Sequence, residues 1–137
     1  EGEKIIDWVQ KSQTKAKEIR NVVNNVLREC YVLDDAGLDH GELSTIDKHV
    51  IINKKRNTII DFESSSIDRK PSNVTGATQA IFIGTGLAKI IQKKIKIPTK
   101  KKIIELIRIY KKDPTLENFE NLTRGLKLQP VVKNKKK

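Results

Sequence analysis

The sequence has few cysteines, few aromatic residues and no long apolar run, and each shortage argues against a class of protein. The single cysteine, Cys30, excludes an internal disulfide, which fits a reducing compartment and predicts a cytoplasmic protein. No apolar run approaches the roughly 20 residues that a helix needs to cross a bilayer, so no membrane association is expected. Aromatic residues make up only 4% of the chain, which disfavours the stacking platforms that many nucleic-acid-binding proteins use.

Acidic residues are also in the minority. The chain has 28 Lys and Arg residues against 17 Asp and Glu residues, so its formal charge is +11. The clearest basic runs are Lys100–Lys102 and the tail 131–137, and we expect the tail to be flexible. The excess has two interpretations: a solvated surface, or a patch that binds RNA or an acidic partner.

Nearly half of the acidic residues, eight of 17, lie in one stretch of the chain. Residues 34–68 hold eight acids against four bases, a net charge of −4 that leaves +15 on the remaining residues. The eight acids are Asp34, Asp35, Asp39, Glu42, Asp47, Asp61, Glu63 and Asp68. Clustered carboxylates repel one another unless protons or a cation compensate, so this stretch is either a solvated acidic rim or a cation site.

The chain contains enough apolar residues, 36%, for one domain with its own core. Apolar periodicity predicts helices over 3–10, 13–33, 74–94 and 100–112, and a fifth that opens at Asp113-Pro114 and closes at Gly125. Cys30 lies on the apolar stripe of the second helix, so we interpret it as a core residue. In the third helix we expect Gly84 and Gly86 to lie at close packing contacts.

Two short β-branched runs, 49–53 and 57–62, flank a polar turn and predict an antiparallel hairpin. The predicted fold class is therefore mainly α with a small β-hairpin, an α+β protein. We expect one domain over 1–130, followed by the tail 131–137.

The hairpin should gather the acids at one end of the sheet. In an antiparallel pair the start of the first strand lies beside the end of the second. Residues 40–48 enter the first strand, and Asp61 and Glu63 leave the second. We therefore expect Glu42, Asp47, Asp61 and Glu63 to come to the same end, where Mg²⁺ would find oxygen ligands.

The motif HGEL at 40–43, followed by a hairpin and then IIDFE at 59–63, resembles the catalytic and metal-binding segments of protein-kinase-like phosphotransferases. The most similar branches are aminoglycoside phosphotransferases, choline kinases, RIO kinases and small archaeal Ser/Thr kinases. The resemblance implies a kinase-like C-terminal lobe, an ATP-dependent and Mg²⁺-dependent transfer reaction, and a protein or small-molecule hydroxyl as the acceptor.

The resemblance also implies roles for individual residues. Asp61 matches the aspartate that binds Mg²⁺ over the ATP phosphates, and Glu63 is a further metal candidate. His40 matches the histidine that braces the metal loop. Glu42 stands where the family has its catalytic aspartate. Asp47 stands where the family has a metal-binding asparagine, although counting back from the first strand places His49 there instead.

The sequence departs from the kinase pattern in one large respect. A Gly-rich phosphate loop followed by a strand lysine is absent, and in these families both belong to an N-terminal lobe. The chain also lacks methionine, so we expect an N-lobe to precede Glu1 or to be supplied in trans, and the isolated chain to be inactive. The alternative function is a catalytically degenerate module that binds RNA or an acidic partner through basic patches, which the glutamate at position 42 favours.

Overall fold

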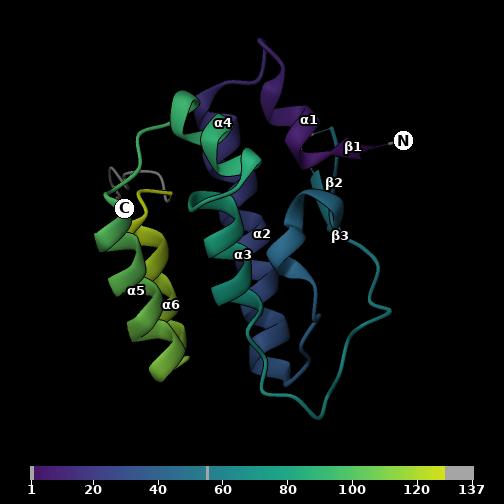
Figure 1. Ribbon diagram of the computed structural model, residues 1–137, viewed down its shortest axis with the longest axis vertical. Helices are drawn as coiled ribbons and strands as arrows, with labels where there is room; N and C mark the ends of the chain where they lie inside the picture. The colour runs from purple at the N-terminus through teal and green to yellow at the C-terminus, as the bar shows by residue number, and fades with distance from the viewer. Residues whose placement is uncertain (1, 55, 129–137) are drawn as a thin grey trace, which may run out of the picture.

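The computed structural model describes residues 2–54 and 56–128, and Figure 1 shows their arrangement. The described residues form mainly helices together with a small antiparallel sheet, so the predicted α+β class with mainly helical content is confirmed. The tail 131–137 lies outside the described residues.

Most of the chain is helical. The α-helices are α1 (Ile5–Gln10), α2 (Ala16–Ala36), α3 (Asn73–Phe82), α4 (Gly86–Lys94), α5 (Lys100–Lys112) and α6 (Leu116–Gly125). A 3₁₀ helix, η1 (Leu43–Lys48), occupies the loop that enters the hairpin. The strands are β1 (Glu3–Lys4), β2 (Val50–Asn53) and β3 (Arg56–Ile59).

The sheet has one more strand than the sequence predicts. Its order is β1-β2-β3, with Glu3 opposite Ile52 and Val50 opposite Ile59. The prediction that residues 3 and 4 are helical was wrong, because their backbone pairs with β2. The third strand ends at Ile59 rather than at residue 62, since Asp61 adopts a left-handed backbone conformation with φ of 65°.

The expected helix over 74–94 is two helices, α3 and α4. Gly84 breaks it, because its φ of 72° suits glycine and would strain other residues. The Thr85 side chain then caps α4 by accepting from the Ala88 backbone N–H at 2.9 Å. No atom lies within 4 Å of where a Cβ would stand at Gly84 or Gly86, so their interpretation as packing contacts was wrong.

Two other helix ends differ from expectation. α2 continues to Ala36, directly before Gly37, and so includes Asp34 and Asp35, which lie beyond the predicted end at residue 33. α6 begins at Leu116 rather than at the proline, because the Thr115 hydroxyl accepts from the Asn118 backbone N–H at 3.1 Å and caps the helix there.

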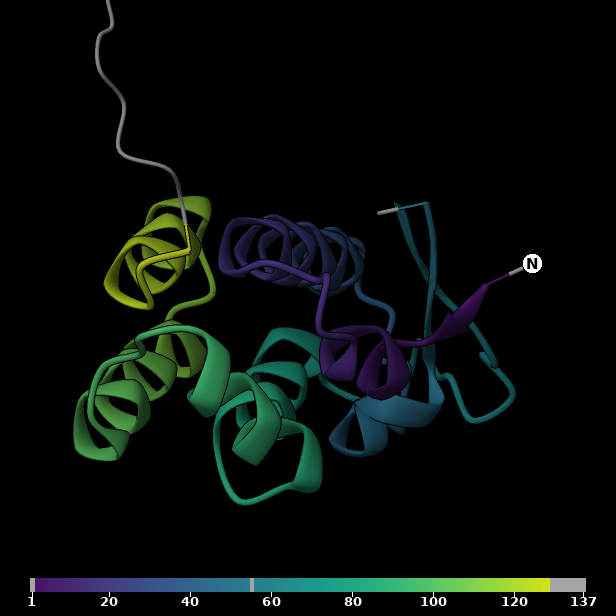
Figure 2. The ribbon, with the colours of Figure 1, turned by 90° about the horizontal axis from the view of Figure 1, so that it is seen from above.

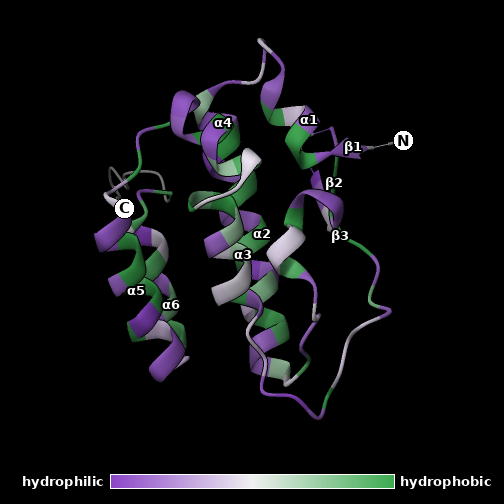
Figure 3. Ribbon diagram, viewed as in Figure 1, coloured by the Kyte–Doolittle hydropathy of each residue, from purple (hydrophilic) through white to green (hydrophobic). Residues whose placement is uncertain are grey.

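Figure 2 shows that α2 and α3 occupy the middle of the molecule, with α5 and α6 on one side and the sheet on the other. The hydrophobic faces of the helices point inward (Figure 3), and the largest fully buried side chains include Tyr110, Phe82 and Phe119. Cys30 is fully buried, as predicted. Within the described residues no single helix is long and apolar enough to cross a membrane; α3 and α4 pass that test only together, and they are bent by 67°.

Candidate functional site

The candidate site lies at the end of the sheet where η1 enters β2 and the chain leaves β3 (Figure 1). The hairpin places these two connections side by side, because the Ile60 backbone N–H donates to the His49 carbonyl at 2.8 Å. Residues that are 12 positions or more apart in the sequence therefore share one small region. The expectation that the hairpin brings them together holds for part of the predicted set.

His40 is fully buried and ties the two connections to each other. Its Nδ1 accepts from the Glu42 backbone N–H at 3.2 Å, so in the neutral ring Nε2 carries the proton. Nε2 then donates to the Ile60 carbonyl at 2.9 Å, one residue before Asp61. The ring also meets Phe62 edge-on, with 4.8 Å between centroids. His40 thus holds the backbone before Asp61 and contacts the side chain that follows it.

His49 is the second buried histidine of the site, and 5% of its side chain is exposed. Its Nδ1 lies 2.9 Å from the Thr45 carbonyl and 3.3 Å from the Thr45 hydroxyl. Its Nε2 faces two carboxylates, at 3.4 Å from Glu42 Oε1 and 3.8 Å from Asp61 Oδ2. His49 is therefore the residue around which the acids of this end converge.

Glu42 and Asp61 are the two acids that meet at His49. Both are partly exposed, at 38% and 47% of the side chain, so solvent and small molecules reach them. The Ser64 hydroxyl donates to Glu42 Oε2, which shows that this carboxylate accepts a hydrogen bond from a hydroxyl in the present conformation. The left-handed conformation of Asp61 directs the chain away from the sheet immediately after β3.

Asp47 and Glu63 do not join this cluster. Asp47 is partly buried in η1, two residues before His49, and Glu63 is exposed in the turn after β3. Among the described residues neither side chain makes a hydrogen bond or ion pair with Glu42, His49 or Asp61. Of the two residues considered for the position of the metal-binding asparagine, His49 is the one that the structure places beside Asp61.

A second set of contacts fastens the loop that carries His40 to the segment after Asp61. Asp39 and Ser66 exchange two backbone hydrogen bonds of 2.9 Å, and Arg69 Nε donates to Asp39 Oδ2 at 2.9 Å. Gly41 fits beneath this bridge: a Cβ would lie 2.7 Å from Arg69 Nη2 and 2.7 Å from the Ser64 carbonyl, and φ is 97°. Glycine is therefore required between His40 and Glu42.

Asp34 is a supporting residue that the sequence reasoning missed. Its Oδ1 accepts from the backbone N–H and the side-chain Nδ2 of Asn73, at 2.8 and 2.9 Å, and its Oδ2 accepts from the Tyr110 hydroxyl at 2.7 Å. Burial and this hydrogen bond to the carboxylate raise the pKa of Tyr110 well above its usual range. Asn73 in turn donates to the Leu38 carbonyl and accepts from the His40 backbone N–H. α2, α3 and α5 thus hold the His40 loop in place.

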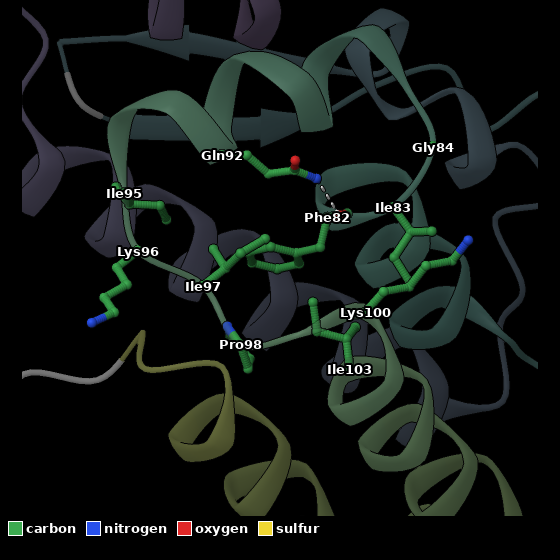
Figure 4. Close-up of a pocket in the computed structure, with 10 residues that line it drawn as sticks. All are labelled: Phe82, Ile83, Gly84, Gln92, Ile95, Lys96, Ile97, Pro98, Lys100 and Ile103. Atoms are coloured by element: carbon green, nitrogen blue, oxygen red, sulfur yellow. Dashed lines mark hydrogen bonds between the residues drawn. The ribbon is translucent and has the colours of Figure 1, made fainter.

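Hollows lie both near the site and beyond it. A groove of about 390 Å³ between α2 and β3 is bordered by Val32, Ile59 and Phe62, next to Asp61. A cavity of about 500 Å³ opens where α3 ends, with Phe82, Ile97 and Ile103 on its walls and Lys96 and Lys100 also lining it (Figure 4). The residues that line this cavity include neither Glu42 nor His49 nor Asp61, so it is separate from the acidic cluster.

In the described part of the chain, the oxygen and nitrogen atoms around His49 do not form a complete metal site by themselves. Among the described residues, no three or more His, Cys, Asp and Glu side chains are grouped closely enough to hold a metal ion by themselves. Carboxylate oxygen and imidazole nitrogen are nevertheless both metal ligands, and ions that act on nucleotides usually take one or two carboxylates and complete their coordination with phosphates and water. Asp61 and His49 supply such an incomplete set.

The fold and the site therefore define a small α+β protein that presents a His–carboxylate cluster at one end of its sheet. No family model matches the sequence. The uncharacterized protein MJ1211 of Methanocaldococcus jannaschii is 32% identical over 93 residues, which cover 66% of this chain and 79% of that protein. The chain belongs to the same family as this archaeal protein.

Proposed function

We propose that the chain is the C-terminal lobe of a protein-kinase-like phosphotransferase that transfers the γ-phosphoryl group of ATP to a hydroxyl group. The observation that carries the proposal is the convergence of Glu42, His49 and Asp61 at the end of one hairpin, with His40 bracing the backbone beside Asp61. These residues come from the HGEL and IIDFE motifs that resemble the catalytic and metal segments of such enzymes.

The roles follow from position and exposure. Asp61 would hold Mg²⁺, which supplies positive charge beside the ATP phosphates. Glu42 would orient the acceptor hydroxyl and take its proton as the new oxygen–phosphorus bond forms and the bond to ADP breaks. The contact between Ser64 and Glu42 supports this role, because a substrate hydroxyl would replace the Ser64 hydroxyl at the same carboxylate. A glutamate reaches one methylene further than an aspartate, which suits a more distant acceptor.

The proposal requires a partner lobe. A kinase binds adenine and triphosphate between two lobes, and this chain would provide the lower wall and the metal ligand. The Gly-rich loop and the lysine that neutralises the phosphates would come from an N-terminal lobe, in cis or in trans. The acceptor would be a protein or a small molecule that carries a hydroxyl group.

The test is ATP turnover with the N-terminal lobe present, comparing wild type with Asp61→Ala. Removing the metal ligand should lower turnover by 10²-fold or more, about 3 kcal/mol in the barrier. Asp68→Asn is the matched control, because it removes an exposed acid of the same stretch and should leave turnover unchanged. Equal turnover by wild type and Asp61→Ala, with both correctly folded, would reject the metal assignment.

A second candidate, a degenerate module that binds RNA or an acidic partner, is favoured by the basic surface of α5. The helix exposes six cationic side chains and one acidic one, Glu105. The cationic residues are Lys100, Lys101, Lys102, Arg108, Lys111 and Lys112. RNA affinity that falls steeply with salt, in a protein that does not bind ATP with its N-terminal lobe present, would favour this candidate.

A further inference from the structure

We propose that the cavity where α3 ends is a second binding site, and that its ligand is a small molecule with an apolar chain and one anionic head, a carboxylate or a phosphate. None of the residues of the acidic cluster lines this cavity, so the inference is independent of the proposed function. The volume of about 500 Å³ is within the range of roughly 300–1,000 Å³ that small-molecule sites occupy. The walls and the charge at the opening each restrict what can bind.

The walls of the cavity are mainly apolar side chains (Figure 4). Phe82 and Ile103 belong to the hydrophobic core, whereas Ile83 and Ile97 are only partly buried and pack against it. A hydrocarbon chain that covered Ile83 and Ile97 would remove their exposed apolar surface from water, which is favourable in proportion to the area covered. The walls therefore suit an alkyl chain.

The backbone around the cavity is fixed by local contacts. α3 and α4 are bent by 67° relative to one another, and Gln92 Nε2 donates to the Phe82 carbonyl at 3.1 Å, which ties α4 to the end of α3. On the other side Pro98 restricts the connection to α5, and the Thr99 hydroxyl accepts from the Lys102 backbone N–H at 3.2 Å and caps that helix. The space between the helices is thus present before a ligand binds.

The charged side chains on the lining are both cationic, Lys96 and Lys100. They belong to residues 93–102, which hold six lysines and no acid. Within the described part of the chain, none of these six lysines forms an ion pair with an Asp or Glu side chain. Like charges at this density repel one another, and an anion bound among them would relieve the repulsion.

Lys96 and Lys100 can approach a ligand from two directions. Figure 4 shows their side chains on opposite sides of the apolar residues, with the two ammonium groups directed away from each other. Both residues are exposed, so each side chain is free to turn toward a negative group at the opening. An ammonium is a compact charge on a flexible stem, and it accepts a carboxylate or a phosphate without the fixed geometry that a guanidinium imposes.

The apolar walls distinguish this site from a general polyanion surface. A surface that holds RNA through its phosphates gains affinity from charge, and a hydrocarbon chain on the ligand adds nothing to it. In the cavity the chain and the head would contribute together. A neutral molecule with the same chain, and a small anion without the chain, should therefore both bind more weakly than a molecule that has both.

The test is isothermal titration calorimetry of the 137-residue chain, with octanoate and octyl phosphate as probes. Octanol has the same chain without the charge, and acetate has the charge without the chain. We expect octanoate or octyl phosphate to bind about tenfold or more tightly than either control, because a hydrogen bond to a charged group and the burial of an alkyl chain each contribute on this scale. The tighter of the two probes identifies the head group.

Variants locate the binding in the cavity. Lys96→Gln/Lys100→Gln should weaken the tighter probe by about tenfold or more and leave octanol unchanged, because only the charge at the opening is removed. The matched control is Lys101→Gln/Lys102→Gln, which removes the same charge from the same run at positions that do not line the cavity and should leave binding unchanged. Ile97→Ser should weaken the probe and octanol alike. Circular dichroism and thermal unfolding would show that each variant remains folded.

Several results would overturn the inference. Acetate that binds as tightly as octanoate would show that the lysines attract any anion, and octanol that binds as tightly would show that the charge plays no part. An equal loss in both lysine pairs would assign the effect to the net charge of residues 93–102 and favour a polyanion surface. A folded wild-type chain that binds neither probe at millimolar concentration would also overturn it. None of these results bears on the role proposed for Asp61.

Discussion

Replacing Asp34 by alanine should destabilise the protein more than any other single change of a partly buried acid in residues 34–68. The substitution removes the acceptor for the backbone N–H of Asn73, for the side-chain amide of Asn73 and for the Tyr110 hydroxyl, at 2.7–2.9 Å. It also removes a negative charge at the N-terminus of α3, where the helix dipole favours one.

The magnitude follows from the donors left behind. A buried donor without a partner costs about 1–3 kcal/mol, but water would enter the space left by the carboxylate and satisfy part of the loss. The Asn73 amide keeps its second bond, to the Leu38 carbonyl. We therefore expect Asp34→Ala to lower the free energy of unfolding by about 3–5 kcal/mol, a large part of the 5–15 kcal/mol of a typical domain.

The assay is urea unfolding followed by circular dichroism, with the slope m compared between variants so that a shift in midpoint reports stability. Asp35→Ala is the matched control. This neighbour is exposed on the same helix, and its change should stay within about 0.5 kcal/mol. Tyr110→Phe removes one hydrogen bond and should lower the free energy of unfolding by about 1 kcal/mol. Because both residues make that bond, the double variant Asp34→Ala/Tyr110→Phe should lose less stability than the sum of the two single variants. If Asp34→Ala were no less stable than Asp35→Ala, the account of Asp34 as the link between α2, α3 and α5 would be wrong.

Two further predictions concern stability. Gly41→Ala should lower the free energy of unfolding by about 2 kcal/mol or more, because its Cβ would sit on a left-handed backbone and lie 2.7 Å from Arg69 and from the Ser64 carbonyl. Gly86→Ala, in open space within α4, should instead raise the free energy of unfolding by up to about 1 kcal/mol. Thermal unfolding of both variants measures the difference, and equal effects would contradict the prediction. Burial raises the pKa of Tyr110 most, and the hydrogen bond to Asp34 raises it further, so the folded protein resists ionisation of this phenol while the unfolded chain ionises near pH 10. The stability that wild type holds over Tyr110→Phe should thus be fully present below pH 10 and shrink as the pH rises above it, and a constant difference between pH 8 and 11 would refute the argument.

The sequence predicted the elements whose signals are local. The apolar stripe of α2, the glycine that ends it and the β-branched hairpin are all properties of short windows, and each appears where expected or within a few residues. The pairing of Glu3 and Lys4 with β2 was missed because a two-residue strand depends on a partner some 50 positions away. The break at Gly84 was missed because the apolar pattern continues on both sides of it.

Part of the candidate site was also predictable from the sequence. Hairpin geometry brings the connections that carry Glu42 and Asp61 to the same end of the sheet, and the motifs single out both residues. The convergence on His49 depends on how η1 winds, which places His49 rather than Asp47 beside Asp61, and no spacing rule shows that. Asp34 was expected to lie just beyond the predicted helix, outside its apolar pattern, and its partners Asn73 and Tyr110 lie 39 and 76 residues further along the chain.

The separation of the acidic cluster from the basic helix α5 makes the molecule electrically asymmetric. The sheet end and α5 lie on opposite sides of the central helices in both Figure 1 and Figure 2. Beside a polyanion the chain would consequently rotate until α5 faces the negative surface, which leaves His49 and Asp61 turned toward free solution. At 0.15 M salt this torque acts only within about 8 Å, so it would orient the protein at contact and not during approach. The carboxylates would then remain accessible from solution while the opposite side is occupied.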